Sequence, residues 1–249
     1  MTTRFALVLM SAGLLAAAEL PTAEAVLNRY VEATGGAEAY RSIKTQTARG
    51  SLEFKAMGLK ATIRTYAALP NNGLTVLELP GMGEIRSGVR DGVAWELSPM
   101  QGPRLLEGIE KENSMRMTRL DAPIRWKELY KEVKVEAEEE AEGKRCFRLV
   151  AVPVSGGKLE TSWYDAETGL LVKSQMVLES PMGEILMETR VTDYRQAGPF
   201  RVPYKLTQKA GPQEFETTME EVQWNVDLPA NQFDVPADIA ALIKKKQQQ

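Results

Sequence analysis

The side chains that most often carry out chemistry in proteins are scarce in this sequence of 249 residues. It contains no histidine and a single cysteine, Cys146. These counts exclude a Ser-His-Asp or Cys-His catalytic group, a histidine-ligated zinc ion and an intramolecular disulfide. Cys146 lies in a stretch of alternating apolar residues, so we expect a buried thiol that no histidine activates.

Carboxylates are the remaining candidates for catalysis or metal binding, and the chain has 34 acidic residues. Five glutamates fall within residues 136–142 (EAEEEAE). An extended chain points alternate side chains to opposite faces, so this run predicts a solvated hairpin tip rather than a cation site. No sequence feature pairs two other carboxylates as a glycosidase requires, and the G-x-S-x-G motif is absent. We therefore predict no catalytic residues, no metal ligands and no cofactor.

Composition and charge indicate a globular chain without the excess of basic residues typical of nucleic-acid-binding proteins. The sequence is 43% apolar and 26% charged, and its 31 basic residues against 34 acidic ones give a net charge of −3. No shift in composition divides it. We expect one domain over residues 19–246 and a disordered tail at 247–249.

The first 18 residues have the organisation of a secretory signal peptide. One basic residue, Arg4, precedes the apolar run 5–18, and Ala16 and Ala18 match the small-residue rule for cleavage after Ala18. This apolar run is too short to cross a bilayer core of about 30 Å comfortably. We predict export to the periplasm through a cleaved signal, and a mature protein that is not integral to the membrane.

The rest of the chain predicts an α+β fold. Apolar periodicity indicates helices over residues 22–34 and 105–120, with a loop at 99–104 before the second. Period-two alternation indicates about ten strands, and the turn sequence Asp91-Gly92 is typical of a hairpin. Consecutive hairpins build an antiparallel sheet.

Large apolar side chains are frequent in these predicted strands, and several strands are apolar on both faces. Such a sheet is either covered on both faces or lines a cavity. Two alternatives stay open: a core filled by the protein's own side chains, or an incompletely filled half-barrel that accepts an acyl chain. In the second case one concave face, covered by the helices 22–34 and 105–120, collects the candidate lipid-binding residues Phe54, Ile63, Trp95, Trp163, Met176, Met187 and Trp224.

Several stretches together resemble one family. They are VLNRYVEATGG (26–36), GVRDGVAWELSPMQGPRLL (88–106), WYDAETGLLVK (163–173), DYRQAGPFRVPYK (193–205) and FDVP (233–236). This pattern resembles the outer-membrane lipoprotein-sorting, LolA/LolB-like superfamily, in an exported bacterial branch. The resemblance implies a curved, unclosed antiparallel β half-barrel with helices over its concave face.

The same resemblance implies a function. It points to a periplasmic carrier that binds a lipid or a lipoprotein acyl chain noncovalently in an apolar groove between sheet and helices. The expected partners are a lipid or acylated lipoprotein and, beyond these, envelope transport proteins, with no nucleic acid. Two alternatives remain: a structural or interaction protein of the cell envelope with a self-filled core, and a hydrolase using carboxylates or Ser/Lys. A groove of about 300–1,000 Å³ favours the carrier.

Overall fold

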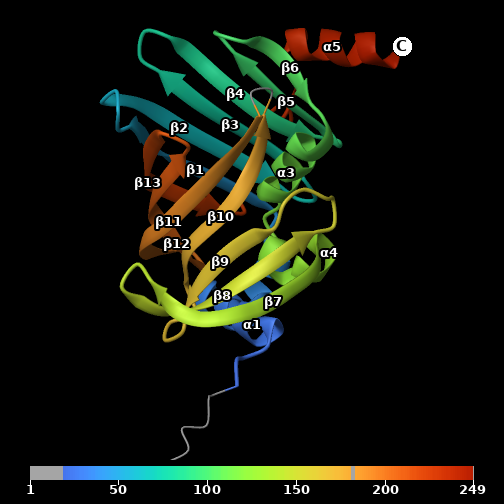
Figure 1. Cartoon of the computed structure of the whole chain (residues 1–249). Helices are drawn as coiled ribbons and strands as arrows, with labels where there is room; N and C mark the ends of the chain where they lie inside the picture. Colours follow the sequence, from blue (N-terminus) through green and yellow to red (C-terminus); the bar gives the residue numbers. More distant parts are fainter. Residues whose placement is uncertain (1–18, 181–182, 249) are drawn as a thin grey trace, which may run out of the picture.

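The structure is a computed structural model that describes residues 19–180 and 183–248 (Figure 1). The predicted signal peptide at residues 1–18 lies outside these residues. The helical elements are α1 (Ala23–Thr34), α2 (Ala37–Ser42), α3 (Gly108–Thr118), the 3-10 turn η1 (Ala122–Ile124), α4 (Trp126–Leu129) and α5 (Ala237–Gln247).

The described residues form thirteen strands in one antiparallel sheet, in the order β6-β5-β4-β3-β2-β1-β13-β12-β11-β10-β9-β8-β7. The strands are β1 (Thr45–Phe54), β2 (Leu59–Ala68), β3 (Asn72–Leu79), β4 (Gly83–Arg90), β5 (Val93–Ser98), β6 (Gly102–Leu106), β7 (Tyr130–Ala141), β8 (Lys144–Pro153), β9 (Glu160–Asp165), β10 (Leu171–Ser180), β11 (Gly183–Ala197), β12 (Phe200–Ala210) and β13 (Gln213–Trp224). Strands β1 and β13 join two meanders, and the sheet stays open at β6 and β7. The predicted α+β class and unclosed antiparallel sheet are confirmed; the strand number is higher than the ten expected.

Strand β6 occupies residues predicted as a loop (99–104) and as the start of a helix (105), so both predictions were wrong there. Strand β6 pairs with β5, and α3 begins only at Gly108. Leu105 packs with the outer cluster around Trp95, whereas Leu106 packs with Val89 on the other side of the sheet. Two adjacent leucines satisfy a strand buried on both faces as well as a helix, so apolar periodicity did not separate these possibilities.

The sheet has two chemically different faces. We call the face that contacts α1 and α3 the inner face, and the opposite one the outer face. Outer-face residues of β2, β3 and β4 form ion pairs, such as Arg64 with Glu78 (3.8 Å) and Glu84 (3.0 Å). Their inner-face neighbours are apolar or carry hydroxyls, such as Thr65 and Ile63. Alternation along β2, β3 and β4 therefore separates charge from the interior.

Helix α3 lies between two arms of the sheet. It contacts β4 and β5 on one side and β10 on the other, although these strands lie far apart in the sheet order. The sheet must curve around α3 to make both contacts, as Figure 1 shows. Gly73 on β3 permits the close approach, because a Cβ there would lie 2.3 Å from Thr118 of α3.

Helix α1 covers the inner face of β7–β10. The Thr22 side chain accepts the Ala25 N–H (3.2 Å) and caps the first turn. Val26 is buried against Leu149 and Tyr164 of the sheet. The predicted helix at 22–34 is thus present, and its apolar stripe meets the inner face.

Helix α5 covers the outer face instead. Ile239 is fully buried in a cluster with Leu74, Val76 and Trp95. The helix continues through its lysines to Gln247, one residue into the segment expected as a tail. The outer face near β3–β5 is therefore apolar because a helix covers it, whereas other outer-face residues, such as Arg64, form ion pairs.

The turn between β9 and β10 holds α1 in place. Arg29 of α1 donates a hydrogen bond to the Glu167 carbonyl, and Gly169 packs under Arg29, where a Cβ would lie 2.8 Å from its Cγ. Asp165 builds this turn, because its Oδ1 accepts the N–H groups of Glu167 (2.8 Å) and Thr168 (3.0 Å). Asp165 thus shapes the turn against which Arg29 of α1 packs.

Burial acts to raise the pKa of Asp165, but the backbone N–H groups and the ammonium of Lys144, 3.1 Å away, outweigh it and lower that pKa to about 2. Replacing Asp165→Ala should reduce the free energy of unfolding near pH 7 by about 2 kcal/mol, because two backbone N–H groups of the turn lose their charged acceptor. Glu167→Ala, an exposed side chain in the same turn, should cost under about 0.5 kcal/mol.

Urea titrations at several pH values measure both effects. The folded pKa lies below the ordinary value of 3.8, so the stabilisation from the Asp165 carboxylate is complete well above 3.8 and is lost as the pH falls from there through 2. The stability gap between wild type and Asp165→Ala should narrow in that interval. Equal losses in the Asp165 and Glu167 variants would contradict this role.

Candidate functional site: a two-chambered groove under helix α3

A cavity of about 240 Å³ lies between the inner face of β7–β10 and the helices α1, α3 and α4. We call it the aromatic chamber. Its walls combine ring side chains with aliphatic ones, and the rings are those of Tyr30, Trp126, Tyr130 and Tyr164. Tyr30 and Tyr164 meet edge to face with ring centroids 5.4 Å apart. Burial raises the pKa of Tyr164 to about 12, so the phenol is neutral at physiological pH.

One buried polar cluster interrupts this apolar wall. Arg116 of α3 forms an ion pair with Glu160 of β9, and their side chains are only 8% and 17% exposed. The Tyr130 hydroxyl donates to Glu160 (2.7 Å), and Arg116 also donates to the Asn113 amide oxygen (3.0 Å). Burial and the Glu160 charge both raise the pKa of Tyr130. The cluster ties α3 to the sheet and leaves no net charge in the chamber.

A second cavity of about 430 Å³ lies on the other side of α3, against β1–β4. We call it the hydroxyl chamber, because Thr65, Thr75 and Ser87 form a row across its floor. Its lining within the described chain includes no charged residue. The two chambers meet at Met117 of α3, which lines both and is 62% exposed.

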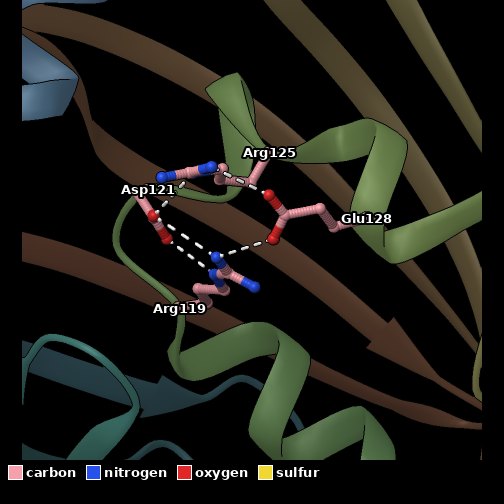
Figure 2. A network of polar contacts seen from close by, with 4 residues as sticks. All are labelled: Arg119, Asp121, Arg125 and Glu128. Atoms are coloured by element: carbon pink, nitrogen blue, oxygen red, sulfur yellow. Dashed lines mark hydrogen bonds and ion pairs between the residues drawn. The ribbon is translucent and has the colours of Figure 1, made fainter.

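Four charged side chains, from the end of α3 to α4, form a compact network of ion pairs (Figure 2). Arg119 contacts Asp121 (2.7 Å) and Glu128 (3.1 Å), and Arg125 contacts the same two carboxylates at 3.4 and 2.9 Å. Asp121 is buried, whereas Arg125 and Glu128 are about half exposed. Two arginines shared by two acids fix the bend at η1 and so hold α4 over the aromatic chamber.

Most of the candidate lipid-binding residues lie on the inner face. Met176 lines the aromatic chamber, and Met187 stands opposite it on β11. Phe54 and Ile63 lie on the inner side of β1 and β2 and are half-buried. Trp224 packs on Phe200 near α1 and α2, with ring centroids 4.3 Å apart.

Trp95 and Trp163 lie on the outer face, which corrects the expectation that one face collects all seven residues. Trp95 stands opposite Gly88 and is 1% exposed under α5, and beside this glycine it also lines the hydroxyl chamber. Trp163 packs with Cys146, which is buried as expected, and donates to Glu139 (2.7 Å). Residue type alone does not identify a face; that depends on register, and α5 covers a part of the outer face that the sequence did not reveal.

The residues that shape the chambers most directly were not singled out from the sequence. Arg116 and Glu160 are separated by more than forty positions, and the tyrosines come from α1, β7 and β9. Residues so far apart in the sequence form no short motif that could predict this site. The usable signal was that Tyr30 lies on the apolar stripe predicted for the helix at 22–34.

The described residues contain neither a candidate metal site nor a helix of membrane-spanning type. No cluster of three or more cysteine, aspartate or glutamate side chains in that part of the chain has a geometry able to hold a metal ion. No helix within it is long and apolar enough to span a membrane.

Comparison with known proteins identifies the fold. A DUF1329 family protein from Desulfovibrio piger matches with a TM-score of 0.61 at 12% identity, over 86% of this chain and 98% of that one. An outer membrane lipoprotein-sorting protein domain from Vibrio parahaemolyticus gives 0.60 at 13% identity over 85% and 97%. A LolA-superfamily protein from Nitrosomonas europaea gives 0.59 at 11% identity over 87% and 99%.

No family model and no curated relative matches the sequence. At these identities the structural likeness establishes the fold alone. The LolA-like fold that the sequence resemblance implied is confirmed.

Removing one partner of the buried Arg116–Glu160 pair should destabilise the protein strongly. Glu160→Gln leaves a buried guanidinium without its counter-charge, which should cost about 3 kcal/mol. The double variant Arg116→Met/Glu160→Gln should lose less than the sum of the single variants, by at least about 1 kcal/mol. Glu38→Gln, in the exposed pair with Arg41, should change little. Urea unfolding measures all four, and strictly additive losses would show that the buried pair is not coupled.

Proposed function

We propose that the protein is a periplasmic carrier that holds the acyl chain of a lipid or lipoprotein noncovalently between the inner face and α1, α3 and α4. The observation that carries the proposal is the pair of cavities of about 240 and 430 Å³ that meet at Met117. The larger lies within the range of about 300–1,000 Å³ typical of ligand sites, and the smaller adjoins it.

The walls of the groove suit an acyl chain. Burying each methylene group contributes about 0.8 kcal/mol, so binding needs apolar contact and no reacting group. Tyr164, Met176 and Leu149 supply such contact from the sheet, and Leu27 supplies it from α1. In this proposal the protein transfers its cargo without a chemical step.

The resemblance and the fold support the same location and cargo. The fold is shared with a lipoprotein-sorting domain and a LolA-superfamily protein, and the sequence begins with a predicted signal peptide. An acyl chain carried through an aqueous compartment has to be shielded from water. The groove offers such shielding, and envelope proteins are the proposed donors and acceptors.

A matched pair of charge substitutions on β10 tests the proposal. Met176→Lys places an ammonium in the aromatic chamber and should abolish binding of the neutral fluorescent probe N-phenyl-1-naphthylamine, because apolar contact is lost and the charge resists dehydration. Gln175→Lys adds the same charge one residue away on the outer face, beside Glu188, and should bind the probe like wild type.

Circular dichroism measures whether both variants are folded. If Met176→Lys is folded and binds the probe as tightly as Gln175→Lys, the aromatic chamber is not the acyl site. If wild type itself binds neither the probe nor a lipid, the alternative of an envelope protein with a self-filled core replaces the carrier.

A further inference from the structure

The hydroxyl chamber differs from the aromatic chamber in a way that an acyl chain alone does not explain. Thr65 stands opposite Thr75, and Thr75 stands opposite Ser87, so three hydroxyl side chains form a continuous row across β2, β3 and β4. Gln46 and Ser114 add further polar groups to the lining. An apolar cargo would leave these groups without partners.

The row is not engaged by the protein itself. None of the hydrogen bonds among the described residues uses the side-chain hydroxyls of Thr65, Thr75 or Ser87. All three side chains are half-buried in the chamber. A hydroxyl both donates and accepts, so the row offers several open positions to a polar ligand group.

The groove also lacks a free charge. Its charged lining in the described chain is Arg116 and Glu160, which neutralise each other. Glu96 stands opposite Ser87 and is paired with Arg104, with Nε and Oε1 3.4 Å apart. A phosphate or carboxylate brought into the chamber would lose water without gaining a counter-ion, which is unfavourable.

We propose that the hydroxyl chamber binds an uncharged, hydrogen-bonding headgroup, so that the preferred cargo is a neutral glyceride-type or glycosyl amphiphile rather than an anionic lipid. This inference rests on the proposed carrier function, with the acyl chain in the aromatic chamber and the headgroup across Met117. Ester carbonyls and hydroxyls of such a headgroup match the donors and acceptors of the row.

Two ligands that differ by one phosphate group test the headgroup preference. 1-Monopalmitoylglycerol and 1-palmitoyl lysophosphatidic acid share an acyl chain and a glycerol, and each displaces N-phenyl-1-naphthylamine from the full-length protein in a fluorescence titration below its aggregation concentration. The neutral lipid should bind at least tenfold more tightly. Equal affinity, or tighter binding of the phosphate lipid, overturns the inference.

Substitution of the row tests the site. Thr65→Val/Thr75→Val/Ser87→Ala keeps the shape of the chamber nearly unchanged. It should weaken the binding of monopalmitoylglycerol about tenfold without weakening the binding of the probe, because only hydrogen bonds are lost. The outer face carries a matched row on β2, β1 and β13. Its variant, Thr62→Val/Ser51→Ala/Thr218→Val, should bind both ligands like wild type.

The outcomes separate the two proposals. If wild type binds the probe but the inner and outer variants bind monopalmitoylglycerol equally, the headgroup site is wrong and the carrier stands. If wild type binds neither the probe nor any of the lipids, the carrier fails and the headgroup site fails with it.

Discussion

The inner face of the sheet needs more cover than α1, α3 and α4 provide, and this constraint shapes the rest of the molecule. Helix α1 has 12 residues and α3 has 11, so each is under about 20 Å long. The thirteen described strands, at about 4.8 Å spacing, would be roughly 60 Å wide if flat. Curvature brings both arms of the sheet to α3, and the space that remains unfilled is the groove.

The polar groups around the groove are placed where they hold this arrangement. Arg116 and Glu160 join α3 to β9, and the Arg119–Asp121–Arg125–Glu128 network fixes the bend that brings α4 over the aromatic chamber (Figure 2). On the outer face, ion pairs across neighbouring strands keep charge in contact with water. The interior is thus electrically neutral although a quarter of the residues are charged, which suits an uncharged cargo.

The sequence predicted the fold class well because local signals were consistent. The apolar periodicity of residues 22–34 and the period-two alternation of the strands each report on a short segment, and the structure contains the corresponding elements. The site was predicted only in part. Met176 and Met187 face the helices, but the sides of Trp95 and Trp163 depend on pairing register and on α5, which long-range contacts decide. The Arg116–Glu160 pair joins α3 to β9, which is distant in the sequence, so no local sequence pattern predicts it.

The central claim is that the groove holds a lipid, and native mass spectrometry of the protein purified gently from a bacterial envelope tests it most directly. The account predicts a population heavier than the polypeptide by the mass of a lipid, released as an intact neutral amphiphile on collisional activation and unaltered by the protein. A polypeptide mass alone, from preparations in which organic extraction also recovers no lipid, would contradict the claim.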